Sequence, residues 1–226
     1  MIDLDPLWLT AELALITTLI LLVVSIPLCY WLAYSKFRLK AAVEAVVSLP
    51  LVLPPSVLGF YLLVAFSPEN WFGKGLENYF DVRLVFTFEG LIIASVLYSL
   101  PFMVHPIQAG LKGLSPSIKE ASFTLGKSKF TTLTKILLPN IKSSILTGIV
   151  LTFAHTIGEF GVVLMVGGSI PNETKVVSIA IYDEVQAMNY GAANLYAGIL
   201  FAFSFLILLI VYLVNNSFSK ANPLNK

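Results

Sequence analysis

The chain has 226 residues, a net charge of only +1 and a mean hydropathy of +0.86. Charged residues make up 12% of it, whereas a soluble domain carries roughly 25%. This composition excludes an ordinary soluble enzyme or binding module and predicts an all-α integral membrane protein. The single cysteine, Cys29, excludes a disulfide framework and a thiolate metal cluster, and we expect no metal site.

Five apolar runs are long enough to cross a bilayer as helices, which takes about 20 residues each. They cover residues 13–34, 43–66, 89–110, 143–166 and 195–214. We therefore expect residues 1–226 to form one transmembrane domain of about five helices.

The second run contains Pro50, Pro54 and Pro55. Proline removes a backbone donor and crowds the preceding turn, so this span should kink or break. Broken backbone at membrane depth is tolerated where it packs on protein or lines a cavity. The span is therefore either an ordinary kinked helix or one that lines a pathway at Pro54 and Pro55.

Positive charges predict the orientation, because cytoplasmic loops are enriched in lysine and arginine. Under the five-span arrangement, eleven of the fourteen lysines and arginines fall on one side. They are Lys36, Arg38, Lys40, Lys112, Lys119, Lys127, Lys129, Lys135, Lys142, Lys220 and Lys226. We therefore expect the N-terminus outside and the C-terminus inside.

Two segments on the predicted outer side are too polar to span the membrane. Residues 67–88 include ENWFGKGLENYF, which suits either a short helix at the membrane interface or a solvated loop. Residues 168–194 are expected to contain an amphipathic helix that dips back toward the bundle.

The predicted cytoplasmic loop, about residues 111–142, contains the segment EASFTLGKSKFTTLTKILLP. Ile118, Ala121 and Leu125 recur at i, i+3 and i+7, which predicts a short helix with a weakly apolar stripe. Gly126 should end this helix, and a second short helix should follow it. The first helix either rests on anionic headgroups or fits the groove of a partner.

The spelling Gly126-Lys127-Ser128 is similar to the end of a phosphate-binding P-loop. A P-loop needs another glycine five residues earlier, where this chain has Ala121, and it must follow a buried strand. We therefore expect no nucleotide site in this chain.

The same loop resembles the EAA signature of ABC-importer permeases, which runs EAA, three residues, G, nine residues, I-x-L-P. Letters and spacing match, except that Ser122 replaces the second alanine. The resemblance implies a coupling helix that sits in a cleft of a separate ATPase subunit, where ATP and magnesium bind. The residues assigned to this coupling are Glu120, Ala121, Ser122, Leu125, Gly126, Ile136, Leu138 and Pro139.

Longer stretches, SLPLVLPPSVLGFYLL and AHTIGEFGVVLMVGGSIPNET, look like the molybdate permeases of bacteria. The resemblance covers nearly the whole chain and implies a multi-pass inner-membrane permease with a type I importer fold. It also implies an external oxyanion-binding protein and the ATPase as partners. One five-span bundle is small for enclosing a pathway and carries one coupling helix, so we also expect a second copy of the chain, besides membrane lipids and without nucleic acid. Tungstate is an expected second cargo, and a sulfate or thiosulfate permease is the alternative.

The fourth span carries a polar stripe at i, i+3, i+4 and i+7, formed by Thr152, His155, Thr156 and Glu159. An ionisable residue inside a span normally faces the bundle interior or a water-filled cavity. The stripe therefore lines the pathway or its gate, or His155 and Glu159 merely satisfy each other. Like charges repel strongly where water is scarce, so Glu159 suits a gate better than an oxyanion site. Thr152, Thr156 and Ser169 are the candidate weak contacts.

Two other classes of protein remain as less favoured alternatives. An intramembrane hydrolase would have to use His155 and Glu159. The chain has only two histidines, His105 and His155, and neither lies in an HExxH arrangement. A channel or an ATP-independent carrier would differ by transporting its cargo without ATP. We expect no catalytic residues.

Overall fold

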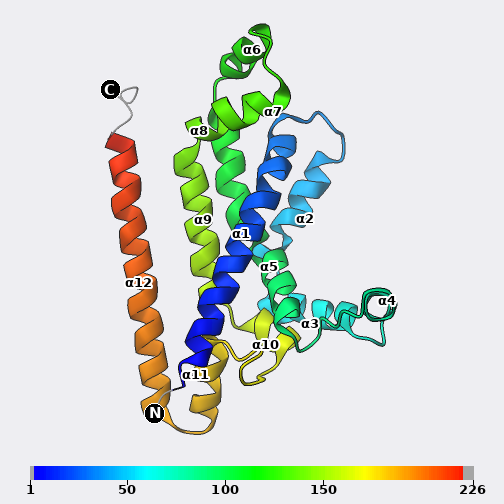
Figure 1. Cartoon of the computed structure of the whole chain (residues 1–226), viewed down its shortest axis with the longest axis vertical. Helices are drawn as coiled ribbons and strands as arrows, with labels where there is room; N and C mark the ends of the chain where they lie inside the picture. Colours follow the sequence, from blue (N-terminus) through cyan, green and yellow to red (C-terminus); the bar gives the residue numbers. More distant parts are fainter. Residues whose placement is uncertain (1–2, 221–226) are drawn as a thin grey trace.

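The computed structural model describes residues 3–220, and every regular element in that range is a helix (Figure 1). Lys226, counted above among the inner charges, lies outside the described residues. Three helices are long and apolar enough to cross a membrane alone: α1 (Asp5–Tyr34), α5 (Phe88–Gly113) and α12 (Tyr190–Lys220). Two bent helix pairs bring the number of candidate spans to as many as five, if each pair counts as one span. The prediction of an all-α membrane bundle is confirmed.

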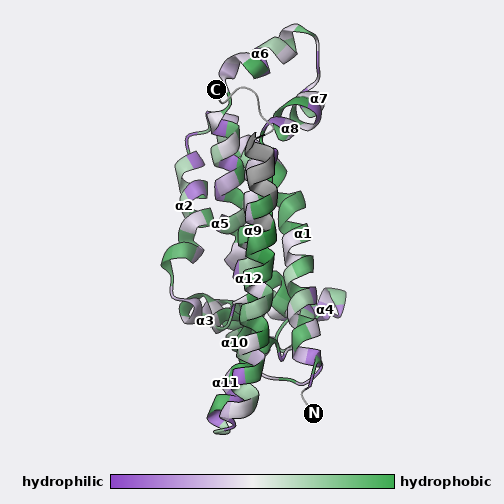
Figure 2. Cartoon of the chain, turned by 90° about the vertical axis from the view of Figure 1, so that its left-hand side faces the viewer, coloured by the Kyte–Doolittle hydropathy of each residue, from purple (hydrophilic) through white to green (hydrophobic). Residues whose placement is uncertain are grey.

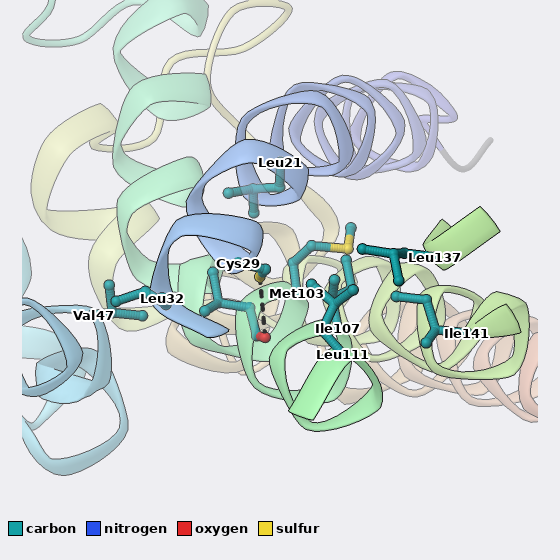
Figure 3. Close-up of a cluster of buried hydrophobic side chains, with 10 residues drawn as sticks. Leu21, Cys29, Leu32, Val47, Met103, Ile107, Leu111, Leu137 and Ile141 are labelled. Atoms are coloured by element: carbon teal, nitrogen blue, oxygen red, sulfur yellow. Dashed lines mark hydrogen bonds between the residues drawn. The ribbon is translucent and has the colours of Figure 1, made fainter. Parts of the chain in front are cut away.

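The centre of the bundle is formed by α1, α5 and α9 (Lys142–Ile157), which pack against one another. Their shared core contains Leu21 and Cys29 from α1 and Met103 and Ile107 from α5 (Figure 3). The Cys29 thiol donates to the backbone carbonyl of Val104 at 3.4 Å, which ties α1 to α5. In contrast, α12 packs mainly on α9 and α11, and most of its described side chains, up to Leu213, are apolar and exposed (Figure 2).

The second predicted span is broken, as its prolines indicated. The helix α2 (Lys40–Val52) ends before Pro54, and α3 (Pro55–Phe66) leaves at an angle of 113°. Pro54 is extended, with φ −54° and ψ 138°, and Pro55 occupies the first helical position of α3, where a missing N–H costs nothing.

The fourth predicted span differs from the single run expected over residues 143–166. The helix α9 ends at Ile157, and a separate helix, α10 (Gly161–Gly167), begins after Phe160. The two glycines beside Glu159 have low helix propensity. A Cβ on Gly161 would lie 2.6 Å from the Cβ of Pro55, so the close packing of α10 on α3 requires glycine there.

Both polar segments expected on the outer side contain the predicted short helices, α4 (Trp71–Phe80) and α11 (Val177–Gln186). The helix α11 buries Val177, Ile179 and Ala180, and the Val177 N–H donates to the Thr10 hydroxyl of α1 at 2.8 Å. The predicted packing of this segment on the bundle is therefore present.

Residues 114–141, here called the basic loop, stand beyond one end of the bundle (Figures 1 and 2). They form α6 (Pro116–Thr124), α7 (Lys129–Thr132), a π-helical turn η1 (Leu133–Leu137) and α8 (Leu138–Asn140). The two expected short helices are present. Ala121 and Leu125 are exposed, and the inward side of α6 is formed by Ile118 and Ser122, one turn apart.

Candidate functional site

The outer face of α6 carries most of the first half of the signature. Glu120, Ala121, Leu125 and Gly126 are all exposed, and the Leu125 side chain is 76% exposed. Gly126 has φ +72°, a left-handed conformation that glycine adopts without a steric penalty, and it turns the chain back toward α7. An exposed leucine beside small residues on a short, sharply ended helix suits insertion into a groove of a partner.

The one departure from the signature, Ser122, is buried and 2% exposed. Its hydroxyl lies 2.8 Å from that of Thr132, which itself donates to the Ser128 carbonyl at 2.9 Å. Because a hydroxyl has a single hydrogen, Ser122 is the donor to Thr132. Ser122 therefore joins α6 to α7, a connection that the sequence did not reveal.

The second half of the signature attaches the basic loop to the bundle. Leu137 is fully buried in the main core, and Leu138 packs against the same core (Figure 3). The Ile136 carbonyl accepts a hydrogen bond from the Asn140 side chain at 2.7 Å, and Pro139 is exposed. The chain then bends by 78° into α9, so α9 connects the basic loop directly to the polar stripe.

A second candidate region lies where the two broken spans meet. An open cavity of about 620 Å³ is lined by residues of the α2–α3 break, of α5 and of the α9–α10 break. These residues are Pro55, Ser56, Tyr98, Ala154, His155, Gly158, Glu159, Phe160 and Gly161. The breaks therefore do line a cavity, which is the condition under which irregular backbone is tolerated in a membrane.

His155 is held from α5 rather than by Glu159. Its Nδ1 atom lies 2.9 Å from the Ser99 hydroxyl, and its ring stacks on Phe102 with centroids 3.9 Å apart. Ser99 also lies 3.0 Å from the Thr156 hydroxyl, so the hydrogen bonds continue into α9. The alternative in which His155 and Glu159 satisfy each other is not what the structure shows.

Glu159 is 4% exposed, and neither carboxyl oxygen has a hydrogen-bond partner among the described residues. The Ser95 hydroxyl lies near the Glu159 carboxyl group, but the two form no hydrogen bond of acceptable geometry. In contrast to the side chain, the backbone of Glu159 has a partner, since the Ser178 hydroxyl donates to the Glu159 carbonyl at 2.6 Å. A buried carboxyl group without a partner is costly, and more so than the unpartnered hydroxyls of Ser95 and Thr152, which are also buried.

Comparison with known proteins agrees with this geometry. Residues 25–220 match the family described as the binding-protein-dependent transport system inner membrane component. The chain belongs to this family. The permease is thus a transport component and a multi-pass protein of the inner membrane, as expected.

Two curated relatives and two solved structures illustrate the similarity. The permease is 47% identical over 210 residues to the molybdenum transport system permease protein ModB of Azotobacter vinelandii, covering 93% of each chain. It is 31% identical over 185 residues to the sulfate transport system permease protein CysT of Escherichia coli (strain K12), covering 82% of this chain and 66% of the relative.

Among solved structures, an inward-facing form of the MetNI methionine ABC transporter gives a TM-score of 0.73 at 15% identity, covering 94% of each chain. A bacterial alginate ABC transporter in complex with an alginate pentasaccharide-bound periplasmic protein gives 0.74 at 21% identity, covering 92% of this chain and 76% of that one. At such identities the likeness shows the fold alone, and it confirms the predicted ABC-importer permease bundle.

The remaining predicted pathway residues of the permease lie in different surroundings. Thr152 and Thr156 are buried and do not line the cavity, and Pro54 is exposed at the helix break. Ser169 is not at the cavity either, because its hydroxyl donates to Asp183 at 2.6 Å, and Lys175 lies 2.9 Å from the same carboxylate oxygen. Burial alone would raise the pKa of Asp183, but the hydrogen bonds from Ser169 and Lys175 and the lysine charge hold that pKa below its usual value.

Sequence reasoning missed the α5 side of the cavity region. Tyr98, Ser99 and Phe102 surround the His155 ring, although they lie in a run that reads as an ordinary apolar span. The only local signal was a serine beside a tyrosine within that run, which is too common in membrane helices to indicate a site.

Proposed function

We propose that this permease is the transmembrane subunit of an ATP-driven importer for molybdate, with tungstate as a second cargo. The observation that carries the cargo assignment is the similarity to a molybdenum permease along nearly the whole length of both chains. The similarity to a sulfate permease is weaker and covers less of that relative, so sulfate or thiosulfate is the second candidate.

The basic loop is proposed to be the coupling site for a separate ATPase, which would hold the ATP and magnesium. The exposed positions Glu120, Ala121, Leu125 and Gly126 support this role, because they lie together at the C-terminal end of the protruding helix α6 and just beyond it. The segment 126–128 follows a helix and not a buried strand, which agrees with the proposal that this chain has no nucleotide site. The proposed orientation places this loop in the cytoplasm and the N-terminus outside.

Two copies of the chain are proposed to enclose one pathway and to present two coupling helices to two ATPase subunits. Closure of the ATPase dimer would draw the coupling helices together. The Ser122–Thr132 hydrogen bond and the buried Leu137 make the loop a unit attached to α9. Its displacement would then reach His155 and Glu159 at the other end of α9, where the pathway opens or closes. An external oxyanion-binding protein would deliver the cargo.

ATP hydrolysis tests this proposal. The permease is reconstituted with its ATPase and binding protein and titrated with molybdate, tungstate and sulfate. Stimulation by molybdate and tungstate but not by sulfate is expected. Stimulation by sulfate alone would support the coupling role of the basic loop but would make sulfate the cargo instead of molybdate. Uptake without ATP would overturn the assignment as an ATP-driven importer.

A further inference from the structure

A small cavity of about 280 Å³ lies between the loop end of α1 and the basic loop. Its walls are aromatic residues of α1, namely Tyr30, Trp31 and Tyr34, and two lysines of the loop, Lys119 and Lys129. None of these residues takes part in the proposed coupling or in the cavity beside Glu159.

The two lysines are cations without an acidic partner. Among the described residues, neither forms an ion pair within 4.0 Å. The Lys119 Nζ atom instead lies 3.9 Å from the centroid of the Tyr34 ring, an aromatic contact that leaves the ammonium donors available. Burial lowers the pKa of Lys119, and the nearby charge of Lys129 lowers it further, against a smaller opposing effect of Glu120. An anion between the two ammonium groups would relieve this repulsion.

The surface that leads to the cavity is apolar. Ile20, Val23, Val24, Pro27 and Trp31 are exposed on α1 at i, i+3, i+4, i+7 and i+11, which places them on one face of the helix. Trp31, the last of these residues, also lines the cavity. A ligand with an anionic group and long apolar chains would therefore match both the cavity and the helix face below it.

We propose that this cavity binds a tetrahedral oxyanion, namely the phosphate group of an anionic phospholipid whose acyl chains lie along α1. The proposal rests on the proposed orientation, which places this end of α1 in the cytoplasmic leaflet, where anionic lipids attract lysines. Tryptophan and tyrosine are also enriched at the depth of the headgroups. A lipid bound here would contact α1 and the first residues of the coupling helix together and would hold α6 against the bundle.

Native mass spectrometry of the purified transporter complex tests the proposal, with equal amounts of phosphatidylglycerol and phosphatidylcholine supplied. The wild type is expected to retain phosphatidylglycerol preferentially. The double variant Lys119→Gln/Lys129→Gln should bind it roughly 30-fold more weakly, since each lysine near the surface contributes about 1 kcal/mol. The matched control is Lys127→Gln/Lys135→Gln, which removes the same charge from two exposed loop lysines that do not line the cavity.

A second measurement keeps both lysines in place. With Trp8 and Trp71 replaced by phenylalanine, Trp31 is the only tryptophan left, and both replaced side chains are exposed. Brominated phosphatidylglycerol should quench its fluorescence more strongly than brominated phosphatidylcholine. Inorganic phosphate and molybdate are added as competitors in a separate arm, and displacement of the lipid by millimolar amounts of either would assign the site to a free oxyanion.

Equal retention of the two lipids by the wild type, or an equal loss in the control pair, would overturn the proposal. A second copy of the chain covering this face of α1 would also overturn it, and would appear as weak quenching by both brominated lipids. These readouts do not depend on transport. An importer that fails to respond to any oxyanion would reject the proposed function and leave the lipid result to be judged separately.

Discussion

At the scale of single residues, the side chains of greatest interest differ in how well they are bonded. Ser122 has a buried hydroxyl with a good partner, whereas Glu159 has a buried carboxyl group with none. The first is typical of a structural residue. The second is uncommon in folded proteins, and a functional role such as a gate is one explanation for it.

Replacing Ser122 by alanine restores the usual signature and removes one buried hydrogen bond. We expect a loss of about 1 kcal/mol in the free energy of unfolding, because the Thr132 hydroxyl keeps its bond to Ser128. Co-purification with the ATPase should be retained. Thermal melting and pull-down measure the two effects, and Thr124→Ala, on the exposed side of α6, is the control. Loss of ATPase binding in Ser122→Ala would contradict the structural role.

Replacing Glu159 by glutamine keeps the shape and removes the possibility of a buried charge. We expect an equal or higher melting temperature, because burying a neutral amide costs less than burying an ion. Uptake should fall while substrate-stimulated ATP hydrolysis persists, because a defect in the gate affects the pathway and leaves the ATPase active. The exposed Glu89, in the first turn of α5, provides the control substitution Glu89→Gln. A lower melting temperature with normal uptake would show that Glu159 is structural.

At the scale of elements, the decisive features are the two helix breaks and the segment that covers them. The break at Pro54 and the break at Gly158–Phe160 face each other because α10 packs closely on α3. The polar segment after α10 is fastened by Ser169, Lys175 and Asp183. The cavity wall thus depends on glycine at the contact between α10 and α3.

A Gly161→Ala substitution tests the contact between α10 and α3. The added Cβ would lie 2.6 Å from the Pro55 Cβ, so the helices must separate, at a cost of about 1–3 kcal/mol. The control is Gly198→Ala in α12, where no atom apart from the adjacent residues and the backbone of the same helix lies within 4 Å of the added Cβ. That substitution should be neutral or slightly stabilising, because alanine has the higher helix propensity. The melting temperature of Gly161→Ala should therefore be lower than that of Gly198→Ala. Equal melting temperatures would refute the close contact between α10 and α3.

The Asp183 cluster predicts a loss of stability in acid. Since the folded state lowers the pKa of Asp183, its contribution is complete above the ordinary value of 3.8 and is lost as the pH falls through the lowered value. The protection factors of residues 168–176 against hydrogen exchange, which correct for the slower intrinsic exchange in acid, should therefore fall as the pH drops below 3.8. Asp183→Asn should show low protection factors at every pH. An identical pH profile in the variant and the wild type would contradict the prediction.

At the scale of the whole molecule, the bundle connects two distant regions through one helix. The basic loop is anchored by Leu137 in the main core, and α9 runs from there to the cavity. Most of α12 remains exposed, which agrees with a surface that faces lipid or a second copy. A subunit built in this way is suited to convert a displacement of the loop into a displacement of the cavity wall.

Assembly with the ATPase should depend on the exposed face of α6. Leu125→Glu is expected to leave the melting temperature nearly unchanged, because the side chain is 76% exposed. Co-purification with the ATPase should be abolished, as it should be when residues 120–126 are deleted. Met188→Glu is the control, because this residue is 78% exposed near the opposite end of the bundle. Retained ATPase binding in Leu125→Glu would place the coupling surface elsewhere.

The sequence by itself determined the class of protein, the first, third and fifth spans, the break at Pro54 and the place of the basic loop along the chain, but not the break at Gly158–Phe160. These follow from composition, from run length and from backbone chemistry, all of which act locally along the chain. It also indicated the family, since the signature depends on letters and spacing alone.

Only the tertiary structure decided which side chains meet. It placed Ser122 on the inward face of α6, paired His155 with Ser99 and left Glu159 without a partner among the described residues. It also showed that Ser169, predicted to lie along the pathway, bonds to Asp183 instead. The physical reason is that such contacts join residues far apart in the chain. Their geometry depends on how whole helices pack, which a periodicity within one helix does not contain.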